Sequence, residues 1–211
     1  MQDISPDECE LIGIILGDGN IYTIGNKYVV GITGNKADTE YFTHIQKMIF
    51  SIWGKQTTPF VSSGALRIRF NSKPVVLRLI NFFGIPAGKG KCEKIRIPEI
   101  IAQDWNKAKH LIRGFTDTDG SVFTANKPGS PNYPSIEITT TSKTIAGQIN
   151  YLLAINGFKP ANVRQYKQKQ FRVVYKVALN GRKNLHAWLG EIGFSNPRKL
   201  QTAKKALGII F

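Results

Sequence analysis

The sequence has few acidic residues and no long apolar run. Asp and Glu number 14 against 29 Lys and Arg, which leaves a formal net charge of +15 in 211 residues. An excess of this size excludes an acidic surface and favours a polyanionic partner, with nucleic acid first and an anionic membrane second. No apolar stretch approaches the ~20 residues that a membrane-spanning helix needs, and no basic amphipathic helix stands out, so we expect a soluble protein without a membrane partner.

Cysteine and histidine are also scarce. Cys9 and Cys92 lack CxxC spacing and no secretory signal precedes them, so we expect reduced thiols in an intracellular protein, in a prokaryotic cytoplasm or an organelle. None of the three histidines lies beside another ligand at zinc spacing, which argues against a zinc site. Apolar residues, in contrast, make up 42% of the chain and are sufficient for a substantial core.

One short stretch occurs twice, and the two copies lie about half a chain apart. Residues 11–19 read LIGIILGDG and residues 112–120 read IRGFTDTDG, each an apolar helical segment with small residues that runs into Asp-Gly. In register, Asp18 corresponds to Asp119, and the likeness continues for several residues beyond. A duplication with one carboxylate per copy indicates two similar halves and a site on a pseudo-twofold axis.

The order of predicted elements is the same in both halves. An apolar helix is followed by a hairpin, a second helix, two more strands and a helical end. We therefore predict an α+β fold of two αββαββα halves, whose antiparallel sheets form a saddle and whose two motif helices pack together. The predicted divisions are residues 1–85 for the first half, 86–102 for a linker rich in Gly, Lys and Pro, and 103–211 for the second half.

Local signals give more detailed predictions. Ser5 is expected to cap the first helix, and Asp38 the second. We also predict a strand over residues 57–61, a helix over residues 74–83, and a Pro/Gly/Asn-rich loop over residues 126–134.

Alternation along the predicted strands gives each sheet one apolar face and one polar or basic face. Helices on the apolar face would leave the other face free to lie along a phosphate backbone. In the major groove, Arg is suited to donate hydrogen bonds to guanine, and Glu is suited to accept one from the amino group of cytosine. The residues that we predict to contact DNA are Lys27, Asn35, Arg67, Arg69, Asn71, Glu137, Thr139, Thr141, Arg164, Tyr166, Arg172 and Lys176.

The paired motifs also predict a metal site. Helices that approach closely at Gly13, Gly17 and Gly114 would bring Asp18 and Asp119 together at their C-terminal ends, where helices carry partial negative charge. Two such carboxylates raise each other's pKa unless a cation lies between them. Hard oxygen donors favour a divalent metal, with Mg²⁺ as the physiological candidate, and such metals promote phosphodiester hydrolysis.

The two motifs and the αββαββα order resemble the LAGLIDADG homing endonucleases, in the single-chain form with two motif copies. The resemblance covers nearly the whole chain. It implies a pseudo-dimeric monomer that binds a long asymmetric double-stranded DNA site in the major groove and cuts both strands, leaving short 3′ overhangs. It also implies two or more Mg²⁺ ions, with Mn²⁺ as a substitute and Ca²⁺ binding without cleavage.

The resemblance assigns roles by position. The catalytic, metal-binding acids fall on Asp18 and Asp119, and the backbone carbonyls of Gly17 and Thr118 become further metal ligands. A polar or basic residue after the first hairpin of each half assists the reaction in this family, which here favours Lys36 first. In the second half the same reasoning favours Lys143, although either lysine could simply neutralise phosphate.

Two departures and several alternatives accompany this interpretation. The sixth motif position is Leu16 in one copy and Asp117 in the other, and Thr118 replaces a small residue at the seventh, which is expected to loosen the helix packing. A maturase that binds intron RNA, alone or combined with the nuclease, and a transcription regulator on the same fold stay open. An intein-borne domain is a further alternative, but no splicing nucleophile begins the chain and no His-Asn pair ends it, so we expect a free-standing, intron-encoded protein.

Overall fold

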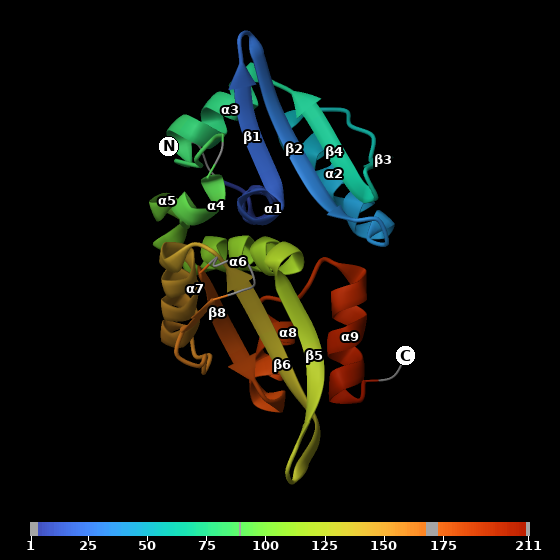
Figure 1. The fold of residues 1–211 in the computed structure, drawn as a ribbon, viewed down its shortest axis with the longest axis vertical. Coiled ribbons are helices and arrows are strands. Elements are labelled where there is room, and N and C mark those ends of the chain that lie inside the picture. The colour runs from blue at the N-terminus through green and yellow to red at the C-terminus, as the bar shows by residue number, and fades with distance from the viewer. Residues whose placement is uncertain (1–3, 89, 168–172, 210–211) are drawn as a thin grey trace.

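Two four-stranded antiparallel sheets lie one above the other, and in the view of Figure 1 both lie in front of helices that cover them. The structure is a computed structural model that describes residues 4–88, 90–167 and 173–209. The first sheet has the strand order β1-β2-β4-β3, and the second has the equivalent order β5-β6-β8-β7. This arrangement confirms the predicted α+β fold of two αββαββα halves.

The helices and strands occur in the same order in the two halves of the chain. The first comprises α1 (Pro6–Gly17), β1 (Gly19–Ile24), β2 (Lys27–Asn35), α2 (Thr39–Trp53), β3 (Phe60–Ser62), β4 (Ala65–Asn71), α3 (Lys73–Leu77) and the π-helix η1 (Arg78–Phe82). Two short helices, α4 (Lys91–Lys94) and α5 (Glu99–Ala102), fall within the predicted linker. The second series comprises α6 (Trp105–Asp119), β5 (Gly120–Lys127), β6 (Ser130–Thr140), α7 (Lys143–Ile155), β7 (Arg164–Lys167), β8 (Val173–Asn180), α8 (Arg182–Glu191) and α9 (Pro197–Leu207).

Three local predictions were wrong in part. The segment 126–134 is mostly strand, because β5 and β6 pair as far as a turn at Gly129, which has the positive φ of +71° that glycine accommodates. Strand β3 begins at Phe60 rather than at residue 57, and Pro59, which has no N–H for the ladder, precedes it. The predicted helix over residues 74–83 widens into η1 at Arg78, where the guanidinium pairs with Glu8 of α1.

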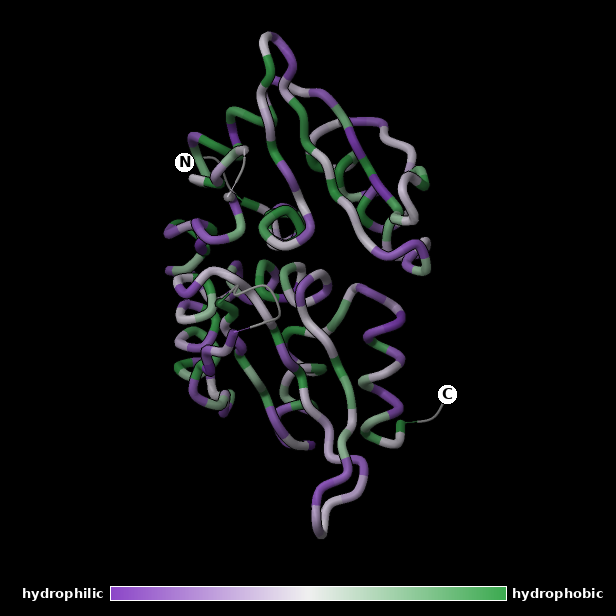
Figure 2. Tube along the Cα trace, viewed as in Figure 1, coloured by the Kyte–Doolittle hydropathy of each residue, from purple (hydrophilic) through white to green (hydrophobic). Residues whose placement is uncertain are grey.

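Helix α1 is buried on all sides from Glu8 to Leu16, and most residues of this stretch are apolar (Figure 2). The Ser5 hydroxyl accepts the N–H of Glu8 at 3.1 Å, so the predicted cap is present. Glu8 and Glu10 are the charged exceptions in the buried stretch, and each has a partner of opposite charge. Burial alone would raise the pKa of Glu10, but His44 and Arg113 hold that pKa below its usual value.

No helix in the described ranges is long and apolar enough to cross a membrane.

The two halves are joined most extensively through α1 and α6. A Cβ on Gly13 would overlap the Leu111 carbonyl oxygen of α6, and a Cβ on Gly114 would overlap the Glu10 carbonyl oxygen of α1. The two backbones are therefore in direct contact at these glycines. A further link crosses the same interface, because Arg113 of α6 forms an ion pair with Glu10 of α1.

The contact at Gly13 and Gly114 can be tested by adding a single methyl group. We expect Gly13→Ala and Gly114→Ala each to lower the free energy of unfolding by about 1–3 kcal/mol, because the added carbon forces the helices apart. The matched control is Gly147→Ala in the interior of α7, where a Cβ meets no atom within 4 Å. That variant should gain roughly 0.5–1 kcal/mol. Chemical denaturation measures all three, and equal effects at the three glycines would contradict the backbone contact.

Candidate active site and nucleic-acid interface

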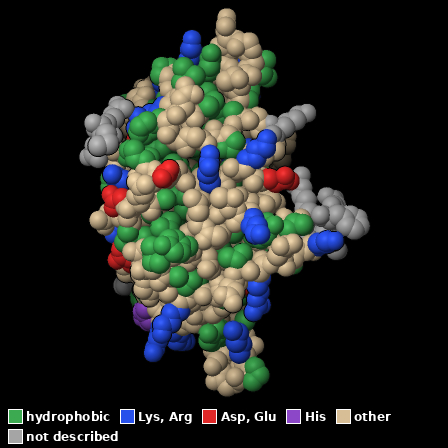
Figure 3. Space-filling model, turned by 90° about the vertical axis from the view of Figure 1, so that its left-hand side faces the viewer, with side chains coloured by type: hydrophobic (Ala, Val, Ile, Leu, Met, Phe, Trp, Pro, Cys, Tyr) green, Lys and Arg blue, Asp and Glu red, His purple; other side chains and the backbone are tan. Residues whose placement is uncertain are grey.

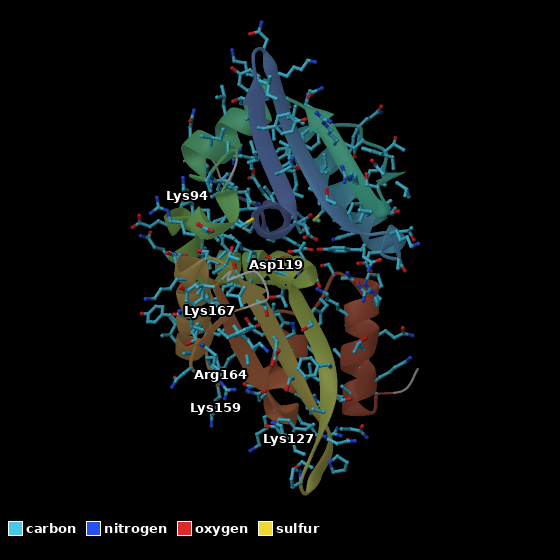
Figure 4. All side chains as sticks on the ribbon, in the orientation of Figure 1. Lys94, Asp119, Lys127, Lys159, Arg164 and Lys167 are labelled. Atoms are coloured by element: carbon cyan, nitrogen blue, oxygen red, sulfur yellow. The ribbon has the colours of Figure 1, made fainter. Side chains whose placement is uncertain are left out.

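Asp18 and Asp119 lie at the ends of the two packed helices. Asp18 is the C-cap residue of α1, where its N–H donates to the Ile14 carbonyl at 3.0 Å. Asp119 is the last residue of α6 and lies between the two sheets (Figure 4). The ends are close together, because a Cβ on Gly17 would lie 3.4 Å from Asp119 Oδ2. The structure thus brings the two predicted acids to one place, on either side of the interface between the halves.

A buried lysine lies under the end of each motif helix. Lys91 of α4 donates from Nζ to the carbonyls of Ile15 at 2.7 Å, Leu16 at 3.0 Å and Gly19 at 2.5 Å. The Ile15 and Leu16 carbonyls belong to the last turn of α1 and carry its partial negative charge, so an ammonium group stabilises them.

Lys199 of α9 has the equivalent position in the second half. Its Nζ donates to the carbonyls of Thr116 at 2.8 Å, Asp117 at 2.7 Å and Gly120 at 2.6 Å, and it lies 3.4 Å from the Thr118 carbonyl. The duplication therefore extends beyond the motif to a lysine that comes from a different element in each half. Sequence reasoning missed both lysines, because they lie far along the chain from the motifs and among several other basic residues.

Burial makes the carboxyl groups unusually weak acids. It raises the pKa of Asp18 to about 6, against the opposing charges of Lys199 and Lys91. Burial, together with the charge of Asp18, raises the pKa of Asp119 to about 7. Burial also lowers the pKa of both lysines. A bound cation would relieve the cost of ionising two neighbouring buried carboxyls.

The oxygen donors at this site fit a hard divalent ion. Within the described residues there is no group of three or more His, Cys, Asp or Glu side chains that could hold a metal, so Asp18 and Asp119 would need further oxygen ligands. The Gly17 carbonyl is suitable, because Lys91 bonds the carbonyls of Leu16 and Gly19 but not this one. The Thr118 carbonyl is only 3.4 Å from Lys199 Nζ, so it is partly engaged.

The two departures from the motif have structural roles. Thr118 fits because Gly17 lies opposite it, and the Thr118 hydroxyl donates to the Phe115 carbonyl at 2.9 Å. The expectation of looser packing at Thr118 was wrong, since the small residue Gly17 compensates for the larger Thr118.

Asp117 Oδ2 accepts hydrogen bonds from the backbone N–H groups of Ser195 at 2.8 Å and Asn196 at 3.2 Å. Asp117 therefore fixes the start of α9, the helix that supplies Lys199.

A second ion pair joins the halves near the site. Asp38 occupies the N-cap position of α2, but its carboxylate makes no cap hydrogen bond and instead receives Arg198 Nε at 2.9 Å. A cleft of about 310 Å³ opens between these elements and is lined by Asp18 and Lys199, among others. Buried polar atoms without a partner in the described structure, Tyr41 Oη and Asp117 Oδ1, belong to residues that line this cleft.

The first sheet presents its predicted DNA-contacting residues on the face opposite the core. Thr33, Gly31 and Val29 of β2 pair with Arg67, Arg69 and Asn71 of β4, so these side chains share a face, while Ile32 and Ile68 point into the core. Residues that pair across an antiparallel ladder lie on the same face of the sheet, and every second residue along a strand lies on that face. The same face therefore also carries Asn20, Tyr22, Lys27 and Asn35. We call this set the open face of the first sheet. The Arg69 guanidinium stacks 5.2 Å from the Tyr22 ring centroid.

The second sheet has an equivalent open face. Glu137 and Thr139 of β6 share it with Lys176 of β8 and with Arg164 and Tyr166 of β7. Thr141 lies just beyond the end of β6, and Arg172 lies outside the described residues. Sequence reasoning missed Ser121 and Phe123 of β5, which the register places on the same face.

Basic side chains extend along this surface. Figure 4 shows Arg164, Lys167 and Lys127 along the second half, below Asp119. On the flank of the molecule in Figure 3, Lys and Arg (blue) outnumber Asp and Glu (red).

The two lysines predicted to assist the reaction lie elsewhere. Lys36 follows β2 and Lys143 begins α7, and both are exposed. Their catalytic role stays a prediction, but the lysines whose charges lower the pKa of Asp18 and Asp119 are Lys91 and Lys199.

Comparison with known proteins agrees with this architecture. Residues 106–193 match the model of a family described as a LAGLIDADG-like domain. The fold resembles a solved structure of I-DmoI in complex with DNA and Ca, with a TM-score of 0.66 and 16% identity over 97% of this chain and 100% of that one. It also resembles the homing endonuclease I-WcaI bound to its DNA recognition sequence, with a TM-score of 0.61 and 17% identity over 98% and 88% of the two chains.

Curated relatives are much longer proteins. The chain is 26% identical over 196 residues to a replication factor C small subunit of Thermococcus kodakarensis, which covers 93% of this chain and 20% of that protein. The Methanocaldococcus jannaschii protein of the same name is 29% identical over 209 residues, covering 99% and 10%. A probable translation initiation factor IF-2 of Thermococcus kodakarensis is 26% identical over 210 residues, covering 96% and 16%. The chain thus spans a tenth to a fifth of these relatives.

The geometry and the comparisons agree on the architecture. Two motif helices in backbone contact, an acid at the end of each, and one open sheet per half make a pseudo-symmetric two-motif protein. Residues 106–193 are similar to the LAGLIDADG-like domain, and the whole chain has the fold of I-DmoI and I-WcaI.

The raised pKa values predict that the carboxyls cost stability when they ionise. Because the folded-state pKa of Asp119 lies above its unfolded value, this cost is absent below about pH 4, grows as the pH rises from about 4 to about 7, and is constant above that. Without metal, Asp119→Asn should therefore melt roughly 2–8 °C above the natural chain at pH 8 and alongside it at pH 4. Scanning calorimetry with and without Mg²⁺ measures this, and Mg²⁺ should stabilise the natural chain more. A variant that melts below the natural chain at pH 8 would show that the carboxylate is not strained.

Proposed function

We propose that this chain is a site-specific homing endonuclease, which binds a long asymmetric double-stranded DNA site and hydrolyses one phosphodiester in each strand with a divalent metal. The observation that carries the proposal is the pair Asp18 and Asp119, held together at the helix ends between two open sheet faces, each above a buried lysine. Cleavage to short 3′ overhangs is part of the proposal and is supported by the likeness to the family alone.

The open faces suit the major groove of a duplex. Each carries Arg or Lys beside short polar side chains, which are the groups that contact phosphates and base edges. Arg67 lies on the open face of the first sheet, and its buried Nε has no hydrogen-bond partner in the described structure. Because the two halves form one continuous surface with different side chains in each, the expected site is long and lacks perfect twofold symmetry.

The residues at the helix ends would position the reaction. Asp18 and Asp119 would hold the metal through their carboxylates, with the Gly17 carbonyl beside them. Bound Mg²⁺ would supply a Lewis acid for the phosphate and a water molecule of lowered pKa. Lys91 and Lys199 fix the carbonyls behind the two carboxylates and offset the negative charge of the helix ends. Their part is positioning and electrostatic, because their protons are already donated to the backbone.

The nuclease proposal is tested on DNA that contains the insertion junction of the natural gene. The natural chain should cut both strands with Mg²⁺ or Mn²⁺, should bind without cutting in Ca²⁺, and should not cut in chelator. Asp18→Asn should cut at least roughly a hundredfold more slowly, because it removes a metal ligand, and should still bind. Affinity should fall steeply with salt, as expected when many phosphates are neutralised.

Two results would count against the proposal. A natural chain that binds this DNA but never cuts it in Mg²⁺ is a non-cleaving binder on the same fold. A nearly flat salt dependence would mean that the basic surface does not lie along DNA. Preference for intron RNA over duplex DNA in the same assay would instead support the maturase alternative.

Replacing a buried lysine separates an electrostatic role from a structural one. In Lys199→Met the opposing positive charge is lost, so the pKa of Asp18 should rise and the pH at which cleavage begins should move upward. We expect cleavage at neutral pH to fall at least about tenfold, with partial recovery at higher pH. Lys205→Met, an exposed position on the same helix, is the control. An unshifted pH profile in a folded Lys199→Met protein would remove the electrostatic role.

The genetic setting is open to a more specific proposal. Segments like this chain occur in replication factor C subunits and in a translation initiation factor, proteins with different names and activities. The simpler explanation for a segment shared by such different proteins is that it is a mobile insertion. The other explanation would require the segment to take part in the activities of both host proteins. We therefore favour the intein-borne alternative over a free-standing intron product, and the mass of the protein made from the natural gene distinguishes the two.

A further inference from the structure

One acidic side chain lies among the strands of this strongly basic protein. Within the described residues, Glu137 is the sole Asp or Glu in any of the strands β1 to β8. The register places it opposite Ser121 of β5 and Ala178 of β8, on the open face of the second sheet. A carboxylate repels phosphate, so its presence on a face that suits a polyanion requires an explanation.

Glu137 is held in place by a basic neighbour. Lys176 Nζ lies 2.5 Å from Glu137 Oε2, and the two side chains are 27% and 22% exposed. Lys176 Nζ also lies 5.5 Å from the Tyr166 ring centroid, so the ammonium is fixed from a second side. The pair lies in a concavity of about 450 Å³ whose lining includes Phe123 and Arg164. Glu137 and Lys176 therefore form a preorganised unit with one acceptor group and one donor group.

The equivalent place in the first sheet carries different chemistry. Gly19 pairs with Ile32 as Gly120 pairs with Ile138, so Gly31 is the counterpart of Glu137. A Cβ on Gly31 would overlap Asn20 Oδ1, which shows that the Asn20 amide covers this position.

The strand on the other side of Gly31 adds a strong donor. Arg69 is the β4 residue that pairs with Gly31, whereas Ala178 pairs with Glu137. At this position the first half therefore offers the Asn20 amide and the Arg69 guanidinium. The second half offers the Glu137 carboxylate beside Ala178, and its ammonium comes from Lys176, the counterpart of Arg67.

We propose that Glu137 and Lys176 together read one C·G base pair in the half-site under the second sheet, and that the DNA target is asymmetric at this position. This inference rests on the proposed function. A carboxylate has no hydrogen to donate, so in the major groove it can accept only from the amino groups of cytosine or adenine. The ammonium of Lys176 needs an acceptor on the paired base, and guanine presents two adjacent acceptors, O6 and N7, where thymine presents one.

The test is selection from a random duplex library, in Ca²⁺ to prevent cutting, with the natural chain and four variants. The natural chain should enrich C·G at one position of one half-site. Glu137→Gln should lose roughly tenfold or more of this preference at that position and leave the other positions unchanged. Lys176→Met should alter the same position, which keeps the proposal testable if Glu137→Gln fails to fold.

Two controls separate base reading from general charge. Arg69→Met should change a position in the opposite half-site. Lys127→Met, an exposed basic residue of β5 that lines the same concavity, should weaken binding to all sequences alike.

The outcomes separate this inference from the proposed function. A uniform gain in affinity for Glu137→Gln, with no change at any one position, would overturn the inference because Glu137 would then act only as a negative charge. A natural chain that enriches a defined site without a C·G pair sensitive to Glu137 would also overturn it while leaving the nuclease proposal standing. A natural chain that enriches no DNA sequence would instead overturn the proposed function.

Discussion

Backbone contact between α1 and α6 at Gly13 and Gly114 is the constraint on which the other features depend. Only glycine permits two helices to approach until the carbonyl of one occupies the place of a side chain on the other. This approach sets the separation of the helix ends and so brings Asp18 near Asp119. It also sets the two sheets one above the other, on either side of the contact between α1 and α6. A helix interface made of larger residues would keep the same halves but would separate the acids.

The helix ends concentrate negative charge, and much of the surrounding structure offsets it. Lys91 and Lys199 donate to the terminal carbonyls, yet burial still raises the pKa of both carboxyls. Such a site is costly without a cation and gains from binding one. The two lysines come from a four-residue helix in one half and an eleven-residue helix in the other. The charge arrangement is therefore common to both halves although the supporting elements are not.

Local pattern was sufficient to predict the fold class and the position of the two acids. The repeated motif fixes the register of Asp18 and Asp119, and strand alternation fixes which residues share each open face. The lysines could not be predicted, because their contacts depend on how α4 and α9 fold back onto the motif helices. Composition suggested a loop over residues 126–134, but pairing of β5 with β6 overrides that local preference. The role of Asp117 was equally hidden, since its partners at Ser195 and Asn196 are remote in sequence.

The two halves meet, in our interpretation, to form one metal-dependent centre. Anomalous diffraction from a crystal of the protein with its DNA site and Mn²⁺ would test this directly. We expect anomalous peaks within bonding distance of the Asp18 and Asp119 carboxylates, between the helix ends and the DNA backbone. Ordered DNA across both sheets with no peak at either carboxylate, or with metal held by other residues, would contradict it.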